Sequence, residues 1–307
     1  MSGVKISVCC FTYNHVAYIS RALDSVLAQN TNFKYEVIIG DDCSNDGSQD
    51  IIKRYATQYP NVIKAIFQPV NSRAKKNIQD VYNAAQGEYI IVLETDDYWL
   101  DNNKLQIQSD FLDNHPDFIA VAHNCIVVNK NEELLNKKYK AISKGEYNYK
   151  HFMRGLLPGQ TTTILYRNPR LLSNIDMSLY EQIKIGPGDL KKIFCLMTGG
   201  KIETLPYIMS AYRYVTIGGN SFSSNHKRDD KSALELYRAF QDYSRKFNNV
   251  SMRLAADVLL LQTALGAWKN KQIENYVLIS YCRLCESPFK TLFNSFLNIF
   301  KNKFCKN

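Results

Sequence analysis

The sequence predicts an α/β fold with a mainly parallel sheet that carries helices on both faces. Three observations favour it: apolar runs of strand length alternate with helix-like segments, each run is almost continuously apolar, and polar clusters follow the runs directly. Strands that are buried on both faces have continuous apolar runs, because neither face meets water. Ligands of such sheets bind beyond the carboxyl ends of the strands, so those polar clusters form the candidate site.

The first half of the chain supplies the regular part of this pattern. Its helix-like segments repeat apolar residues every three or four positions, as one face of a helix does. The expected strands are 4–11, 35–40, 61–67 and 88–94. The expected helices between them are 15–30, 48–60 and 72–87. Strands that are separated by helices in this way are expected to run parallel.

The second half of the chain is more mixed. We expect, in order, a helix, a long strand, a shorter strand, a helix that opens at a Pro-Gly pair, and a pair of strands: 103–116, 117–129, 159–168, 187–200 and 201–215. From about residue 227 the pattern is helical to the end. We therefore expect one domain over 1–225 and a C-terminal helical region over 226–307.

Composition and charge restrict the class of protein and of partner. The chain has 307 residues, of which 45% are hydrophobic, enough for a large core and unlike a disordered or collagen-like chain. Its formal charge of +9 predicts an anionic partner, unless the charge serves solubility alone. Zinc-finger spacing, an RNA-binding aromatic signature and a basic run are all missing, so we expect no nucleic acid. The anionic partners that remain to be considered are a phosphorylated small molecule and an anionic membrane surface.

The N-terminus and the cysteines favour a cytoplasmic protein. Residues 1–14 lack the basic start and long apolar middle of a secretory leader, and apolar stretches of the ~18 residues that span a bilayer do not occur. Eight cysteines in a long chain of this kind fit a reducing compartment. Cys282 and Cys285 form a CxxC motif without a second pair of ligands, which argues against a structural zinc.

Two adjacent carboxylates, Asp96 and Asp97, follow the strand expected at 88–94. Such a pair at a strand end is costly unless a cation or hydrogen-bond donors meet it. Hard oxygen ligands suit Mg²⁺ or Mn²⁺, and such ions commonly bridge to substrate phosphates. A solvated turn is the alternative, but the position at the ligand-binding edge of an α/β sheet favours a metal.

Two further polar clusters follow the first two strands. Asp41 and Asp42 could accept a hydrogen bond from a pyrimidine N3–H or from ribose hydroxyls, or could form an Asx turn into the next helix. We expect at least one of them to do only the latter. In the segment Phe11–Asn14, Tyr13 could stack on a base or could be an ordinary loop aromatic.

Taken in this order, the segments resemble the opening of family 2 glycosyltransferases, which have the GT-A fold. The stretches that carry the resemblance are "ISVCCFTYNHVAYISRALDSVLAQ", "EVIIGDDCSNDGSQDIIKRY" and "AAQGEYIIVLETDDYWLDNNKLQIQSDFL". The resemblance is dense over about 4–125 and thins to scattered matches up to about 222. It implies a nucleotide-sugar donor half over 1–125 and an acceptor half over 126–225.

The resemblance also implies roles for individual residues. The donor-binding residues that it implies are Phe11, Tyr13, Asn14, Asp42 and Asp96. Tyr13 would stack near the uracil, and Asp42 would hydrogen-bond it. Asp96 would lie near the ribose and the metal, and Asp97 would be the principal ligand of a divalent cation, Mn²⁺ or Mg²⁺, on the diphosphate. Many relatives have Asp-X-Asp where this chain has Thr95-Asp96-Asp97, and the second Asp is kept.

Family 2 enzymes also have a catalytic base, often the Asp of a short motif at a helix start. Here "IGPGDLKKIF" supplies Asp189, which could instead be only a helix N-cap, and Asp176 and Glu181 are its nearest competitors. The base must take the proton from the acceptor hydroxyl while that oxygen attacks the anomeric carbon. The "YR" strand of the family follows in the expected order, as Tyr212 and Arg213.

Departures from the family pattern carry information as well. The "QxxRW" motif of processive synthases is missing, so we expect transfer of a single sugar. A His that often helps to close such sites is missing from the loop after Arg213, and His226 is its nearest substitute. In 288–307, aromatic and leucine residues recur at helical intervals among lysines. That pattern is typical of a helix on an anionic membrane, although a helix docked on the protein or on a partner shares it.

The sequence therefore predicts a metal-dependent glycosyltransferase that moves one hexosyl or N-acetylhexosaminyl group from a UDP-sugar to a hydroxyl of a glycan or lipid-linked acceptor. Inversion at the anomeric carbon is implied by the family. The enzyme would be cytoplasmic, could lie peripherally on the membrane, and would act in polysaccharide biosynthesis. Two alternatives remain: a nucleotidyltransferase, against which the glycine-free "CCFTYNH" argues, and a non-catalytic scaffold relative.

Overall fold

The computed structural model describes residues 3–153, 156–175 and 188–214, and the single residues 177, 180, 241 and 253. These residues form two compact units. The first holds the described residues of 3–148, 156–175 and 196–214, and the second holds those of 149–153, 177–195, 241 and 253. The domain boundary expected at residue 225 lies outside the described residues and stays a prediction.

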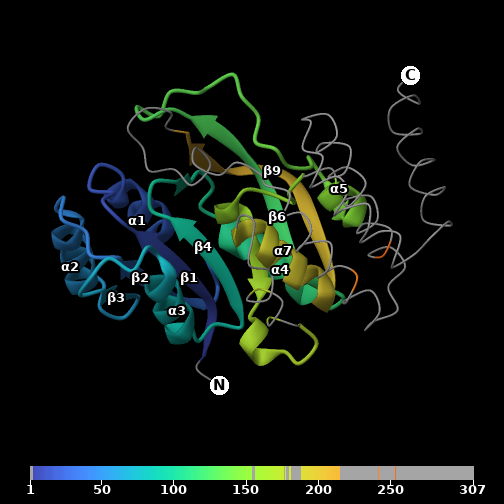
Figure 1. Cartoon of the computed structure of the whole chain (residues 1–307), viewed down its shortest axis with the longest axis horizontal. Helices are drawn as coiled ribbons and strands as arrows, with labels where there is room; N and C mark the ends of the chain where they lie inside the picture. The colour runs from blue at the N-terminus through green and yellow to red at the C-terminus, as the bar shows by residue number, and fades with distance from the viewer. Residues whose placement is uncertain are drawn as a thin grey trace, which may run out of the picture. The chain divides into compact units, whose positions relative to one another are not determined.

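Strands and helices alternate through the first half of the chain (Figure 1). The strands are β1 (Val4–Thr12), β2 (Lys34–Asp41), β3 (Ile63–Phe67), β4 (Tyr89–Glu94), β5 (Tyr98–Trp99), β6 (Phe118–Val128), β7 (Gly145–Tyr147), β8 (Leu165–Arg167) and β9 (Lys201–Arg213). The α-helices are α1 (Ile19–Leu27), α2 (Ser48–Gln58), α3 (Lys75–Ala84), α4 (Lys104–Asn114), α5 (Tyr149–Met153) and α7 (Gly188–Gly199). Short 3₁₀ helices are η1 (Thr161–Thr163) and η2 (Pro169–Leu171).

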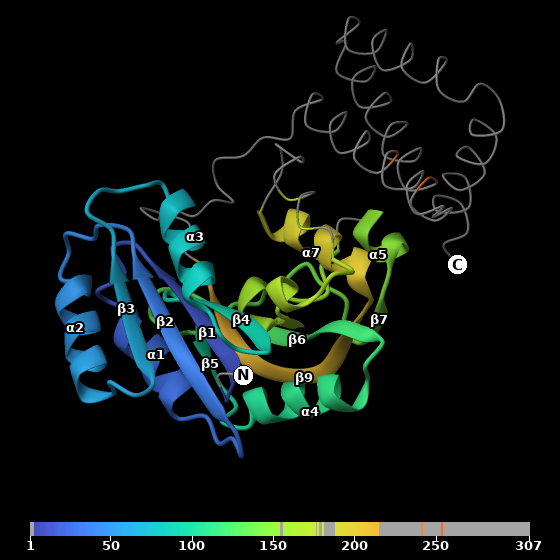
Figure 2. The same ribbon diagram turned by 90° about the horizontal axis from the view of Figure 1, so that it is seen from below.

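The described strands form one mixed sheet in the order β3-β2-β1-β4-β8-β6-β9-β5, with β7 beside β9. The first four strands along the chain run parallel to one another, as their continuous apolar cores predict, and β4 pairs with β8 in antiparallel fashion. Helices α1, α2 and α4 pack on one face and α3 on the other (Figure 2). The α/β fold with helices on both faces of a mainly parallel sheet is therefore confirmed.

Close packing of α3 on the sheet depends on a glycine in β2. A Cβ atom at Gly40 would collide with the side chains of Asn77 and Val81 on α3. Without it, Nδ2 of Asn77 donates to the carbonyl of Gly40 at 2.9 Å. The loop that precedes α3 is thereby brought to the carboxyl end of β2, where Asp41 lies.

Two of the later strands that the sequence predicts differ from the structure, and β5 and β7 were not predicted. The sequence predicts a pair of strands over 201–215, but β9 is a single strand that pairs in parallel with β6. The pairing register shifts between Leu205 and Ile208, so Pro206 and Tyr207 form a bulge. Pro206 has no N–H to donate to the neighbouring strand, and the bulge leaves it outside the hydrogen-bond ladder. The strand expected at 159–168 begins only at Leu165, since the three threonines before it coil into η1.

A lysine is completely buried beneath the sheet. Lys104 begins α4, and its Nζ donates to Oε1 of Gln108 at 2.6 Å and lies 4.3 Å from the ring centroid of Trp99. Burial lowers the pKa of Lys104 well below its ordinary value of 10.5, against the opposing charge of Asp101. Burial first, and then the charge of Lys104, also lower the pKa of His123.

We expect the free energy of unfolding to rise with pH because of Lys104. The folded chain holds this amine neutral in a pH range where the unfolded chain protonates it, so the unfolded state binds more protons. The free energy of unfolding rises over the pH range between the lowered pKa of Lys104 in the folded chain and its ordinary pKa. The rise is at most about 1.4 kcal/mol per pH unit. Urea unfolding above about pH 7, where histidine contributes little, should show this slope in wild type and not in Lys104→Met. Lys64→Met, at an exposed lysine of β3, is the matched control, and equal slopes in wild type and Lys104→Met would contradict the argument.

Candidate active site

The carboxyl ends of β1, β2 and β4 meet at one edge of the sheet. Strand β1 pairs with both of the others, and its last residue, Thr12, lies opposite Asp41. The hydroxyls of Thr12 and Thr95 lie 2.9 Å apart, and the Thr95 hydroxyl is 2.8 Å from Nδ1 of His15. These contacts tie the loop after β1 to the turn after β4. The polar clusters predicted from the sequence therefore share one edge of the sheet.

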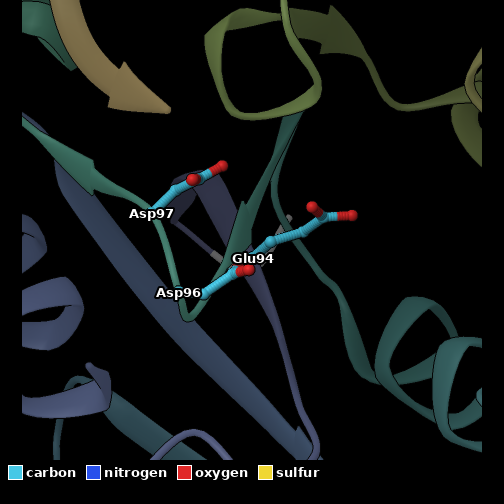
Figure 3. A group of neighbouring side chains, drawn as sticks. All are labelled: Glu94, Asp96 and Asp97. Carbon is cyan, nitrogen blue, oxygen red and sulfur yellow. The ribbon is translucent and has the colours of Figure 1, made fainter. Parts of the chain in front are cut away.

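Three carboxylates, Glu94, Asp96 and Asp97, gather at the end of β4 (Figure 3). One oxygen atom of each lies within 4.8 Å of the others. Asp97 is 1% exposed, whereas Glu94 and Asp96 are half-buried. Burial first, and then the charges of Asp96 and Glu94, raise the pKa of Asp97 well above its ordinary value. The cluster offers the hard oxygen ligands that a divalent cation takes, and a cation would relieve the repulsion among them.

Both oxygens of Asp97 accept hydrogen bonds from distant parts of the chain. Nε2 of Gln160 donates to Oδ2 at 2.8 Å, and the backbone N–H of Arg213 donates to Oδ1 at 2.7 Å. These two bonds lower the pKa of Asp97 against the larger effect of burial. Gln160 was not predicted as a site residue, and it is buried with one end of its amide on this carboxylate.

The guanidinium of Arg213 braces the turn that carries the acidic cluster. Arg213 is 3% exposed as a whole residue, and its Nε donates to the backbone carbonyl of Asp96 at 2.8 Å. It also forms a 3.0 Å ion pair with Glu132 and lies 4.4 Å from the ring centroid of Tyr18. Burial, and then the charges of the three carboxylates, raise the pKa of the neighbouring Tyr212. The "YR" pair at the end of β9 therefore borders the acidic cluster.

The two aspartates at the end of β2, Asp41 and Asp42, have different surroundings, although both are buried. Oδ1 of Asp42 accepts from the backbone N–H and the hydroxyl of Ser72, at 2.9 and 2.7 Å, and its Oδ2 accepts from the backbone N–H of Ala74 at 2.7 Å. Asp41 accepts from the backbone N–H of Ser44 at 2.9 Å, which closes the turn toward α2. Asp41 is thus the turn-forming member of the pair, and Asp42 faces the loop before α3.

The aromatic segment after β1 divides in a similar way. Tyr13 is 38% exposed, so its ring is accessible to a planar ligand. Phe11 is half-buried and packs edge-on against Tyr82, with 5.6 Å between the ring centroids. Asn14 has a left-handed backbone with φ of 56°, and its Oδ1 accepts from the backbone N–H of Asn45 at 3.0 Å. Asn14 therefore joins the loops after β1 and β2.

Asp189 belongs to the second unit. It lies in the first turn of α7 and is half-buried. Its competitors Asp176 and Glu181 lie outside the described residues, as do His226 and the tail 288–307. A carboxylate in the first turn also suits the positive end of the helix dipole. The role of Asp189 as a base stays a prediction.

The chain has relatives of known family. Residues 7–173 match the family model described as Glycosyl transferase family 2. An uncharacterized protein of Mycobacterium tuberculosis is 33% identical over 213 residues, which cover 68% of this chain and 58% of that protein. An uncharacterized glycosyltransferase of Nostoc is 35% identical over 134 residues, 44% of this chain and 40% of the relative. The chain thus spans less than two thirds of the length of these relatives.

A solved structure extends the likeness to the fold. The crystal structure of S. aureus TarS 1–349 in complex with UDP-GlcNAc has a TM-score of 0.60 at 19% identity, and the match covers 91% of this chain and 92% of that one. The family match spans β1 to β8, and therefore includes Asp42, the acidic cluster and Gln160. This chain belongs to glycosyl transferase family 2.

Proposed function

We propose that this chain is a metal-dependent, inverting glycosyltransferase that moves one sugar from a UDP-sugar to a hydroxyl of a glycan or lipid-linked acceptor. The observation that carries the proposal is the acidic cluster of Glu94, Asp96 and Asp97 at the sheet edge that also holds Asp42 and Tyr13. Membership of the family supports sugar transfer. The TarS complex, which holds UDP-GlcNAc, supports UDP as the nucleotide.

The surroundings of Asp42 support a pyrimidine base. An ionised carboxylate only accepts hydrogen bonds, and it has about four lone-pair positions. Ser72 and Ala74 use three of them, which leaves one for the N3–H of uracil. The accessible ring of Tyr13 can stack on the base, a contact worth roughly 1–3 kcal/mol for aromatic side chains.

The acidic cluster supports a divalent cation. In the described part of the chain, the ion pairs leave out Asp96 and Asp97, and the nearby Arg213 directs its guanidinium to carbonyls and to Glu132. The negative charge of Asp96 and Asp97 is therefore available to a metal, which Asp97 would hold together with Asp96 and Glu94. When bound, such an ion offsets the charge that grows on the leaving diphosphate.

The proposed base is Asp189, by analogy with the family motif. Its carboxylate takes the proton of the acceptor hydroxyl while the hydroxyl oxygen bonds to the anomeric carbon. The bond from that carbon to the diphosphate breaks, and UDP leaves with the electron pair. A single displacement from the opposite face inverts the anomeric configuration.

Calorimetric titration of UDP into the full chain, with Mn²⁺ and then with EDTA, tests the donor site. We expect UDP to bind with Mn²⁺ and to bind much more weakly in EDTA. Absence of UDP binding under both conditions would overturn the donor assignment. A non-catalytic scaffold relative would bind UDP with Mn²⁺ and yet consume none of a panel of UDP-sugars.

Asp42→Asn should weaken UDP binding by about tenfold and reduce the preference for UDP over CDP. The amide can present a donor where the carboxylate accepts, and a hydrogen bond to a charged group is worth roughly 1.5–3 kcal/mol. Cytosine carries an acceptor at N3, so CDP should lose less than UDP. Calorimetric competition between the two nucleotides measures the ratio, with Asp50→Asn on the exposed first turn of α2 as the control. A ratio equal to that of wild type would contradict the role of Asp42.

The helices in the described part of the chain are all too short or too polar to span a bilayer. We further propose, from the sequence alone, that 288–307 contacts an anionic membrane surface. Sedimentation of the full chain with phosphatidylglycerol vesicles and with phosphatidylcholine vesicles tests this. Preferential binding to the anionic vesicles is the expected result, and equal binding or no binding would contradict it.

A further inference from the structure

Gln160 is a buried amide with both polar ends engaged. Its Nε2 donates to Oδ2 of Asp97 at 2.8 Å, and its Oε1 accepts from the backbone N–H and the hydroxyl of Thr162, each at 2.7 Å. Gln160 is 2% exposed and Asp97 1% exposed. The backbone N–H of Thr162 can only donate, so it must meet the amide oxygen of Gln160. The NH₂ group of Gln160 therefore faces the carboxylate.

The turn that carries Gln160 is itself fixed by buried hydrogen bonds. The hydroxyl of Thr163 donates to the backbone carbonyl of Gln160 at 2.7 Å. Nε2 of Gln108 donates to the carbonyl of Thr163 at 2.8 Å, and Nε1 of Trp99 donates to that of Thr162 at 3.3 Å. All of these side chains are buried. A side chain whose backbone and two polar ends are all held has little freedom to move.

The carboxylate of Asp97 is held from two sides. Gln160 binds one oxygen, and the backbone N–H of Arg213 binds the other at 2.7 Å. Two bonds from different donors, one on each oxygen, fix the plane of the carboxylate. Each oxygen then keeps one lone pair for a further partner.

We propose that Gln160 is a positioning residue that sets how Asp97 presents its oxygens to a divalent cation. This inference rests on the metal-dependent function proposed above. A neutral amide suits the task, because it donates to the carboxylate without adding a positive charge that would compete with the metal. Outer-shell partners that orient a metal ligand in this way typically change metal affinity by roughly 10- to 100-fold when they are removed.

Gln160→Met tests the proposal, because it removes the donor and nearly keeps the length of the side chain. Thr162→Val is the matched control: it removes one donor from the far end of Gln160 and leaves the contact with Asp97. Electron paramagnetic resonance of free Mn²⁺, with saturating UDP and the full chain, gives the Kd for Mn²⁺. We expect Gln160→Met to raise this Kd by about tenfold or more, and Thr162→Val to raise it less.

The dependence of UDP binding on Mn²⁺ separates positioning from a structural defect. In Gln160→Met the curve of UDP binding against Mn²⁺ concentration should move to higher Mn²⁺. It should still reach the wild-type level of UDP binding, since excess metal compensates for a badly oriented Asp97 carboxylate. A misfolded protein would instead lower the plateau. Gln160→Asn, which keeps an amide but is one methylene shorter, is the second variant and should shift the curve in the same direction.

The outcomes distinguish this inference from the proposed function. Equal Kd values for Mn²⁺ in wild type and the folded variants at position 160 would overturn the positioning role and leave the metal-dependent function standing. A lowered plateau that excess Mn²⁺ does not restore in either variant would also overturn it, in favour of a structural role. A wild-type chain that binds no Mn²⁺ in the presence of UDP would overturn the proposed function and this inference together.

Discussion

Asp97→Asn is expected to abolish the metal dependence of UDP binding while the chain stays folded. Asparagine has the shape of aspartate, and its amide oxygen can still accept from the backbone N–H of Arg213. The negative charge that a cation needs is lost. Removal of an outer-shell partner alone changes metal affinity by roughly 10- to 100-fold, so loss of the principal ligand should raise the Kd for Mn²⁺ by more than about 100-fold. UDP titration over a series of Mn²⁺ concentrations measures this.

The stability of the same variant gives an independent readout. Burial and two neighbouring carboxylates raise the pKa of Asp97, so its charged form is unfavourable in the folded chain without metal. Metal-free Asp97→Asn removes this cost, but its NH₂ group then faces the NH₂ group of Gln160 where Oδ2 accepted a hydrogen bond, so its unfolding temperature should stay close to that of wild type. Asp110→Asn, at an exposed carboxylate of α4, is the control for loss of one negative charge. Wild-type Mn²⁺ dependence in Asp97→Asn would refute the assignment of Asp97 as the ligand.

Asp189→Asn is expected to stop turnover and to spare donor binding. A general base contributes typically 10²- to 10⁴-fold, so the rate of UDP release from a UDP-sugar that wild type consumes should fall by about that factor. The affinities for UDP and Mn²⁺ should stay the same, because the base acts on the acceptor. Stopped assays of released UDP, with calorimetry on the same protein, measure both quantities.

The control for Asp189→Asn must separate the loss of a general base from the loss of a charge that stabilises the helix. Asp189 lies in the first turn of α7, where a carboxylate also stabilises the helix through its dipole. Asp50 lies in the first turn of α2, is exposed and has no proposed chemical role, so Asp50→Asn is the matched control. A turnover rate near that of wild type in Asp189→Asn would move the base to Asp176 or Glu181.

The sequence alone was sufficient for the regular half of the fold, for a physical reason. Strands buried on both faces must be apolar throughout, so β1, β2 and β4 are visible as runs bounded by polar residues. The site lies where those runs end, which placed Asp42, Asp96 and Asp97 at one edge of the sheet before any coordinates. Glu94 could also have been found, since it is the last residue of β4 and lies only two and three positions before Asp96 and Asp97.

The residues that hold Asp97 could not be found in this way. Gln160 lies 63 positions from Asp97 and Arg213 lies 116 positions from it, so no local pattern links them. The different roles of Asp41 and Asp42 depend on Ser72, which donates to Asp42 and lies 30 positions after it in the sequence. Likewise β9 stays one strand because it pairs with β6 on both sides of the bulge at Pro206 and Tyr207, a pairing that the proline in the sequence does not reveal.

Crystals of the full chain grown with UDP and Mn²⁺ give the most direct test of the donor site. The proposed function predicts an anomalous manganese peak within coordination distance of the Asp97 carboxylate and of the UDP diphosphate, with the uracil beside Asp42. UDP bound at this edge of the sheet without a manganese peak, or a peak that lies away from Asp97, would contradict it.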